Sequence, residues 1–172
     1  MAGDALIAYH SALEAHGKAY SVFERTYYVT NRNTRPVVFR SYRFAGVRPP
    51  AALRTRHTEG FGVKTLDRSG IAVRVTSLER TLVDVLDRPD LGGGWEEIWR
   101  SLESIEFLDL EKVVAYTLLL DNATTVAKVG YFLDRHREKL MVGNEHIAPL
   151  RKRRPLRPHY MDRARRGKGV FV

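Results

Sequence analysis

The spacing of apolar residues changes at Thr76, and this change divides the chain into two kinds of structure. Before it, Ile71, Val73 and Val75 stand at every second position, as on one face of a β-strand. After it, the apolar residues recur with the period of a helix, at Leu78, Leu82, Val85 and Leu86. A strand-rich half followed by a helical half predicts the α+β class.

The first half contains one expected helix and two expected antiparallel hairpins. Helical spacing of apolar residues starts at Leu6 and ends at Gly17, which predicts that a helix opens the domain. Aromatic and β-branched residues, interrupted by turn-forming residues, predict the hairpins over residues 19–42 and 61–75. The segment between them, residues 45–60, has little periodicity and is expected to be a connection.

The second half is expected to hold a layer of about four helices and then a basic extended arm. The apolar pattern predicts helices over residues 76–88, 95–102, 110–118 and 122–140. Pro149, Pro155 and Pro158 are expected to prevent a continuous helix beyond Gly143. Residues 1–145 are therefore expected to form the domain, and residues 146–172 to form an arm that packs on it or continues it.

Charge is distributed unevenly along the chain, whose net charge is +9. Residues 18–65 hold ten Lys and Arg against two Asp and Glu, and residues 146–172 hold nine against one. Residues 66–145 hold ten against fifteen. Two basic segments therefore flank an acidic one. The basic ends are expected either to fold against the acidic centre or to present cationic surfaces to a polyanion.

The composition excludes several classes of protein. The chain has no cysteine, which excludes disulfides, thiolate metal sites and cysteine nucleophiles. Its apolar runs are shorter than the roughly 18 residues that a membrane span requires, and residues 1–4 lack the features of a secretion signal. The chain is therefore expected to be cytoplasmic and to make no contact with a membrane.

No complete catalytic motif is present in the sequence. The six histidines form no H-E-x-x-H motif, and Gly92–Gly94 lack the Gly-Lys-Ser/Thr of a phosphate-binding loop. Lys64, Asp67 and Arg74 are not accompanied by the paired carboxylates that a metal-dependent nuclease requires. We therefore expect no enzymatic activity, no cofactor and no metal. A metal-dependent nuclease is the least favoured alternative.

The densest cluster of polar side chains lies at the start of the helix expected at residues 76–88. Thr76 and Glu79 match a capping box. Arg80 and Asp84 are four residues apart, which predicts an ion pair on one helical face. Such roles favour a structural function over a binding site for the whole cluster, which consists of Thr76, Ser77, Glu79, Arg80, Thr81 and Asp84.

Two groups of cations are candidate contacts for DNA or RNA. One group lies in the first predicted hairpin, at Arg32, Arg35, Arg40 and Arg43. The other lies in the arm, where aromatic rings for base stacking are nearby; it consists of Arg151, Lys152, Arg153, Arg154, Arg157, Arg163, Arg165, Arg166 and Lys168. Docking of the arm on the acidic helices is an equally supported alternative, because a run of charge is a weak signal.

The segment VTSLERTLVDVLDRP, at residues 75–89, resembles the signature of the AbiEi antitoxin domain. AbiEi proteins are the antitoxins of type IV toxin–antitoxin and abortive-infection systems, which act in phage defence. The same resemblance extends over nearly the whole chain, through residues 8–17, Gly92–Gly94, residues 95–102, Ala115-Tyr116 and Val129-Gly130.

The resemblance implies a protein that neutralises a cognate nucleotidyltransferase-like toxin of the AbiEii type and represses its own operon. In the family, an N-terminal winged helix-turn-helix binds the promoter, and the domain after it supplies antitoxicity. This sequence has no room for a winged helix before Asp4. It is therefore expected to be a fragment or a short homologue, or to contact DNA through the arm. The resemblance also implies that Thr76, Ser77, Arg80, Thr81 and Asp84 are signature positions. The oligomeric state and the mechanism of neutralisation stay open.

Overall fold

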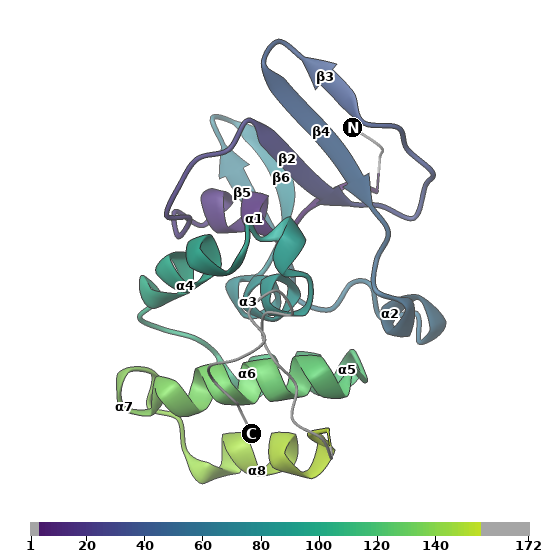
Figure 1. The fold of residues 1–172 in the computed structure, drawn as a ribbon. Coiled ribbons are helices and arrows are strands. Elements are labelled where there is room, and N and C mark those ends of the chain that lie inside the picture. Colours follow the sequence, from purple (N-terminus) through teal and green to yellow (C-terminus); the bar gives the residue numbers. More distant parts are fainter. Residues whose placement is uncertain (1–3, 156–172) are drawn as a thin grey trace, which may run out of the picture.

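The strands of the first half form one six-stranded sheet of order β3-β4-β2-β1-β6-β5 in the computed structural model, which describes residues 4–155 (Figure 1). The antiparallel pairs are β1–β2, β3–β4 and β5–β6, whereas β2–β4 and β1–β6 are parallel. The sheet is therefore mixed. Its strands are β1 Leu6–Ile7, β2 Arg25–Val29, β3 Val37–Phe39, β4 Tyr42–Val47, β5 Val63–Arg68 and β6 Ile71–Thr76.

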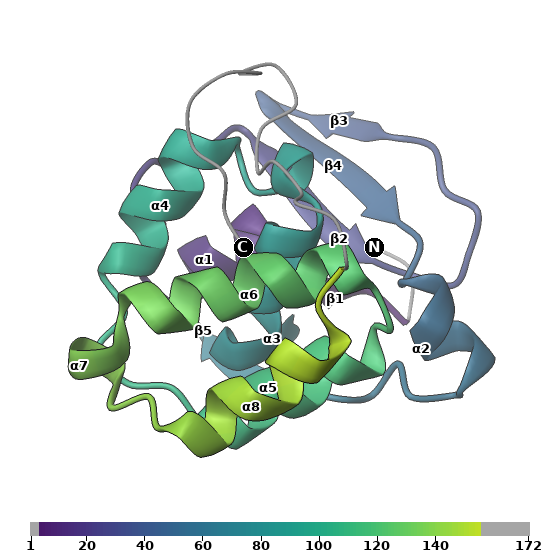
Figure 2. The same cartoon turned by 60° about the horizontal axis from the view of Figure 1, so that its bottom comes forward.

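Most of the helices lie below the sheet in the view of Figure 1, with α3 between the sheet and the layer formed by α5, α6 and α8 (Figures 1 and 2). The combination of one sheet and a helical layer confirms the predicted α+β class. The helices are α1 His10–Ala15, α2 Ala51–Thr55, α3 Leu78–Asp87, the 3-10 turn η1 Pro89–Leu91, α4 Trp95–Glu103, α5 Leu110–Leu119, α6 Ala123–Arg135, α7 Arg137–Leu140 and α8 Asn144–Arg153.

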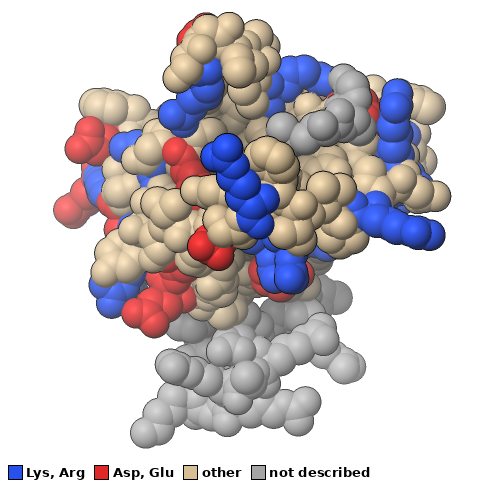
Figure 3. All heavy atoms as spheres, turned by 90° about the horizontal axis from the view of Figure 1, so that it is seen from above, with Lys and Arg blue, Asp and Glu red and all other residues tan. Residues whose placement is uncertain are grey.

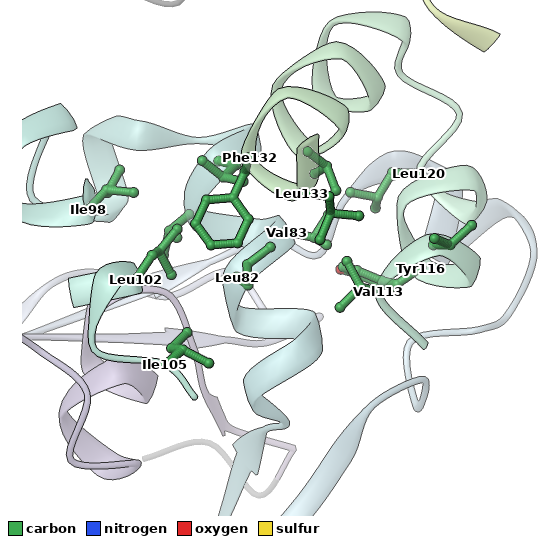
Figure 4. Close-up of a cluster of buried hydrophobic side chains, with 14 of the residues drawn as sticks. Leu82, Val83, Ile98, Leu102, Ile105, Val113, Tyr116, Leu120, Phe132 and Leu133 are labelled. Atoms are coloured by element: carbon green, nitrogen blue, oxygen red, sulfur yellow. The ribbon is translucent and has the colours of Figure 1, made fainter. Parts of the chain in front are cut away.

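The main core surrounds α3. Figure 4 shows Leu82 and Val83 of this helix facing the apolar side chains of α4, α5 and α6. Leu82, Val85 and Leu86 are fully buried, as the helical spacing predicts. Burying a side chain of this size stabilises the fold by roughly 1.5–3 kcal/mol. The apolar stripe of α3 therefore joins the sheet to the helical layer.

The second predicted hairpin is confirmed, whereas the first one is wrong. β5 and β6 pair around the turn at residues 67–70, where the Asp67 carboxylate accepts a hydrogen bond from Gly70 N–H (3.0 Å). In residues 19–42, β2 does not pair with its neighbour β3. It pairs in parallel with β4, and the hairpin is β3–β4, which turns at Arg40 and Ser41. The turn-forming residues 31–36 instead connect β2 to β3, which is not its neighbour, because β4 lies between the two strands in the sheet.

Three other expectations are corrected by the elements observed. β1 precedes the first helix, which is shorter than predicted, although Gly17 has the left-handed φ of +66° expected after it. Residues 45–60, expected to be a connection, contain the end of β4 and all of α2. The helix expected at 122–140 divides into α6 and α7 at His136.

The expected boundary at residue 145 falls inside α8, so residues 146–153 are helical and not extended. Pro149 lies within this helix and removes one backbone hydrogen bond. Ile147 and Leu150 are both buried, and their packing holds the helix together despite the proline. The remainder of the predicted arm, residues 156–172, lies outside the described residues. Within residues 4–155, no helix combines the length and apolar character needed to cross a membrane.

Candidate functional site

The predicted capping box at the start of α3 is wrong, because the cap is Ser77 and not Thr76. The Ser77 hydroxyl accepts a hydrogen bond from Arg80 N–H (3.4 Å), while Thr76 is the last residue of β6. Because β6 includes Thr76, the helix begins one residue later than a capping box formed by Thr76 and Glu79 requires. Thr76 instead shares a buried hydroxyl contact of 2.7 Å with Thr81, and Glu79 accepts a bond from Asp109 N–H (3.5 Å).

Arg80 connects α3 to the loop before β5. Its side chain is fully buried, and Nη1 donates to the carbonyls of Glu59 (2.8 Å) and Phe61 (2.7 Å). Nε donates to the Asp84 carboxylate at 3.3 Å. The predicted pair therefore exists, but it lies in the interior and not on an exposed helical face. Within the described residues, Nη2 has no hydrogen-bond partner.

Asp84 extends this network to α5. Its Oδ1 accepts a hydrogen bond from the Tyr116 hydroxyl at 2.7 Å. Burial raises the pKa of the Asp84 carboxyl, and the Arg80 guanidinium and the Tyr116 hydroxyl oppose that rise. Burial also raises the pKa of Tyr116 well above 10, so its hydroxyl stays protonated and able to donate. The network joins three elements and offers no exposed chemical group to a ligand.

Half of the ten basic residues of residues 18–65 lie in or beside the β3–β4 hairpin. Residues 31–48 contain five arginines and no Asp or Glu. All five arginines are exposed, including the four predicted candidates Arg32, Arg35, Arg40 and Arg43. Arg32 Nε lies 3.7 Å from the Asp4 carboxylate. The fifth arginine, Arg48, donates hydrogen bonds to the backbone carbonyl of Asn31 and to the side-chain oxygen of Asn33. The structure describes no carboxylate within ion-pair distance of Arg35, Arg40 or Arg43.

Apolar side chains are exposed on the same hairpin, which the sequence pattern alone does not indicate. Phe39 and Tyr42 are register partners, and Val37 is the partner of Phe44. Alternation along the strands places these four on one face of the sheet. Phe39 is 64% exposed and Val37 57%, and the Arg40 guanidinium lies 5.6 Å from the centre of the Phe39 ring.

Figure 3 views the molecule from above the sheet. On the side where Figure 1 places the β3–β4 hairpin, Lys and Arg side chains stand among uncharged surface, and most of the acidic side chains lie toward the opposite side. The alternation of cations and uncharged surface is the composition expected of a surface that contacts a polyanion with aromatic or apolar groups.

The second basic group lies at the other end of the molecule from the hairpin (Figure 1). Arg151, Lys152 and Arg153 form the exposed last turn of α8, and Arg154 follows it. Arg153 lies 3.7 Å from Asp121, so one cation of the predicted arm contacts an acidic residue of the helical half. The structure therefore does not bring the two basic groups together. Arg157, Arg163, Arg165, Arg166 and Lys168 lie outside the described residues.

A buried polar cluster around His10 was not predicted. His10 Nε2 lies 3.1 Å from the Glu97 carboxylate, Nδ1 lies 3.0 Å from that of Glu14, and the ring stacks on Phe23 with centroids 3.9 Å apart. Glu97 also accepts hydrogen bonds from Ser21 N–H and the Ser101 hydroxyl. Because His10 and Glu97 are 87 positions apart, no local pattern indicates their pairing.

Two of the surface hollows lie beside the basic groups. One, of about 800 Å³, lies between β2, β4 and the turn before α4, and it mixes two arginines with two carboxylates: Arg25, Arg43, Glu24 and Asp90. The other, of about 500 Å³, lies between α6 and α8. Within residues 4–155 there is no group of three or more His, Asp or Glu side chains arranged to hold a metal.

Comparison with known protein families finds none that matches this chain, and comparison with curated proteins finds no match either. The resemblance to the AbiEi domain therefore stays a prediction. The residues that carry it lie mainly in the buried face of α3 and in α4, while the exposed arginines of the hairpin lie outside the signature segment.

Proposed function

We propose that this chain is an antitoxin or regulatory domain that counteracts a nucleotidyltransferase-like toxin of the AbiEii type. It acts in the cytoplasm, catalyses no reaction, and contributes to repression of its own operon. The observation that carries this proposal is the segment at residues 75–89, which resembles the AbiEi signature along its whole length.

The burial of that segment supports a division of roles within the domain. Arg80, Thr81 and Asp84 are buried and bonded to each other or to neighbouring elements. A buried network of this kind maintains a fold and presents no surface to a macromolecular partner. We therefore assign recognition to exposed surface, and specifically to the β3–β4 hairpin with its unpaired arginines.

Co-expression with the toxin encoded beside this gene tests the proposal. Cells that express the toxin alone are expected to stop growing, and cells that also express this chain are expected to grow. A control strain carries the empty second vector. If growth stays arrested while the chain accumulates in folded form, the antitoxin proposal is wrong.

A second candidate function is nucleic-acid binding without sequence preference. The five arginines of residues 31–48, with no acidic residue among them, favour it. Cations that neutralise phosphates release counterions, so the affinity is expected to fall steeply as the salt concentration rises. In a plot of the logarithm of the binding constant against the logarithm of the salt concentration, each phosphate contacted contributes about 0.7 to 0.9 to the steepness of the slope.

Titration of labelled oligonucleotides over a range of salt concentrations tests this second candidate. Replacing Arg35, Arg40 and Arg43 with Gln is expected to lower the salt slope by about 0.7 for each of the three that contacts a phosphate of a single strand. The matched control replaces three exposed arginines elsewhere, namely Arg54, Arg74 and Arg135. Absent binding, or equal slopes for the two triple variants, would remove the hairpin from this role.

A further inference from the structure

The exposed rings of the β3–β4 hairpin call for an explanation that its charge does not provide. Phe39 and Tyr42 lie side by side across the two strands, and they are 64% and 47% exposed. Contact with phosphates requires only arginines. Large apolar side chains that lie adjacent on one surface, with cations around them, instead mark a binding surface with an apolar component.

Charge complementarity limits what this surface binds. Val37, Phe39 and Tyr42 share a face of the hairpin, and Arg35 and Arg40 stand just outside the two ends of β3. The segment holds no carboxylate that would repel a polyanion or compete for the arginines. A ligand that fits must carry both negative charge and flat apolar groups.

Unpaired nucleotides have this combination, and base-paired nucleotides do not. In a duplex, the faces of the bases are stacked on each other and only their edges reach the grooves. In a single strand, each base has a free face that stacks on an aromatic ring, while the phosphates beside it contact arginines. Rings that project from a sheet surface are well suited to this kind of stacking.

We infer that the face of the hairpin formed by Val37, Phe39 and Tyr42 binds unpaired bases of a single-stranded nucleic acid, and that Arg35 and Arg40 contact its phosphates. Arg40 also lies against the ring of Phe39, which aligns the phosphate contact with the stacking surface. This inference rests on the second candidate function and adds the class of ligand. Arg43 follows Tyr42 along β4, so its side chain lies on the opposite face of the sheet and is not part of this surface.

Fluorescence anisotropy of the full chain with labelled oligonucleotides of about 12 residues, a length within the range of known single-strand sites, tests the inference. The probes are single-stranded RNA, single-stranded DNA and a DNA duplex of the same sequence. Both single strands are expected to bind at least about tenfold more tightly than the duplex, because each stacked base contributes about that factor. Tighter binding of RNA than of DNA, or the reverse, agrees with the inference if both exceed the duplex.

Substitutions of the two rings give a second measurement. The double variant Phe39→Ala with Tyr42→Ala is expected to lose at least about tenfold in affinity for single strands, with little change for the duplex. Phe39→Tyr with Tyr42→Phe keeps both rings and is expected to bind like the wild type. Phe107→Ala is the matched control, because Phe107 is 77% exposed in the helical half.

The possible outcomes distinguish a failure of this inference from a failure of the nucleic-acid-binding function on which it rests. If none of the three probes binds at low salt, nucleic-acid binding itself is wrong. If binding requires Arg35 and Arg40 but the duplex binds as tightly as the single strands, the inference alone is overturned. Unchanged affinity of the folded double alanine variant for single strands overturns it as well. The comparison of the three probes uses only the wild-type chain, so it tests the inference even if the variant does not fold.

Discussion

At the scale of single residues, the interior of this protein depends on charges that are paired out of reach of water. The Arg80 and Asp84 side chains have almost no exposed surface, and their partners come from the loop before β5 and from Tyr116 in α5. Removing a charge from water is costly, so such a pair stabilises a fold mainly when both members are present. Loss of the Asp84 carboxylate is therefore expected to be strongly destabilising, because it leaves the buried Arg80 guanidinium without its counter-charge.

Asp84→Asn is expected to lower the free energy of unfolding by about 3–5 kcal/mol, because it leaves the Arg80 guanidinium buried without its counter-charge. Urea denaturation measures the change. The matched control is Asp134→Asn, which breaks the exposed pair with Arg137 and is expected to cost about 1 kcal/mol or less. Equal losses in the two variants would show that the buried pair has no special role.

Glu97 is expected to make stability depend on pH. Burial opposes its ionisation, but hydrogen bonds from Ser21, His10 and Ser101 outweigh burial and hold the pKa of Glu97 below its ordinary value of 4.5. Since the folded state favours the ionised form, this group stabilises the protein above that pH, and its contribution is lost as the pH falls through the lowered pKa.

The Glu97→Gln variant removes this titration. It is expected to be less stable than the wild type at about pH 7, and the difference is expected to shrink at about pH 3, which lies below the ordinary pKa of 4.5 at which the unfolded chain takes up the proton. Chemical denaturation at both pH values measures the difference. A difference that stays constant between them would contradict the assignment.

At the scale of elements, local sequence patterns predict the helices and hairpins that are held together by contacts between residues close in the sequence. The stripe of Leu82 to Leu86 predicts α3, and the turn at residues 67–70 predicts the β5–β6 hairpin. The parallel pair β2–β4 has no local signal, because its register joins residues 18 positions apart, such as Arg25 and Arg43. Tertiary packing likewise overrides Pro149 in α8.

The candidate site was predicted in part for the same reason. The arginines of residues 31–48 are evident from the sequence, since this stretch has five cations and no acidic residue. The exposure of Phe39 and Tyr42 is not, because aromatic residues in a strand pattern are usually buried. Their exposure follows from the tertiary fold, in which β3 is the edge strand of the sheet and β4 lies beside it.

The turn between η1 and α4 is expected to require glycine. Gly93 has a φ of +89°, and a Cβ there would lie 2.7 Å from Phe23 Cε2 and 2.9 Å from Glu97 Cγ. Gly93→Ala is therefore expected to destabilise the fold by about 1–3 kcal/mol, measured by urea denaturation. Gly60→Ala is the control, because nothing lies within 4 Å of its added Cβ. Equal stabilities of the two variants would be inconsistent with strain at Gly93.

At the scale of the whole molecule, the candidate cations within residues 4–155 form two separate surfaces. The β3–β4 hairpin stands at one end of the molecule and the basic last turn of α8 at the other, with the sheet and the helical layer between them (Figure 1). A single short ligand does not reach both. Neutralising one surface is therefore expected to leave the properties of the other unchanged, which makes the hairpin testable by itself.

The central claim is that α3 maintains the scaffold while the exposed hairpin performs the recognition that restrains the toxin. Growth of cells that express the neighbouring toxin, together with each of three forms of this chain, tests it most directly. The wild type and the control variant with Gln at positions 54, 74 and 135 are expected to restore growth. The variant with Gln at positions 35, 40 and 43 is expected to accumulate in folded form without restoring it. Full restoration by the hairpin variant, or none by the wild type, would contradict the claim.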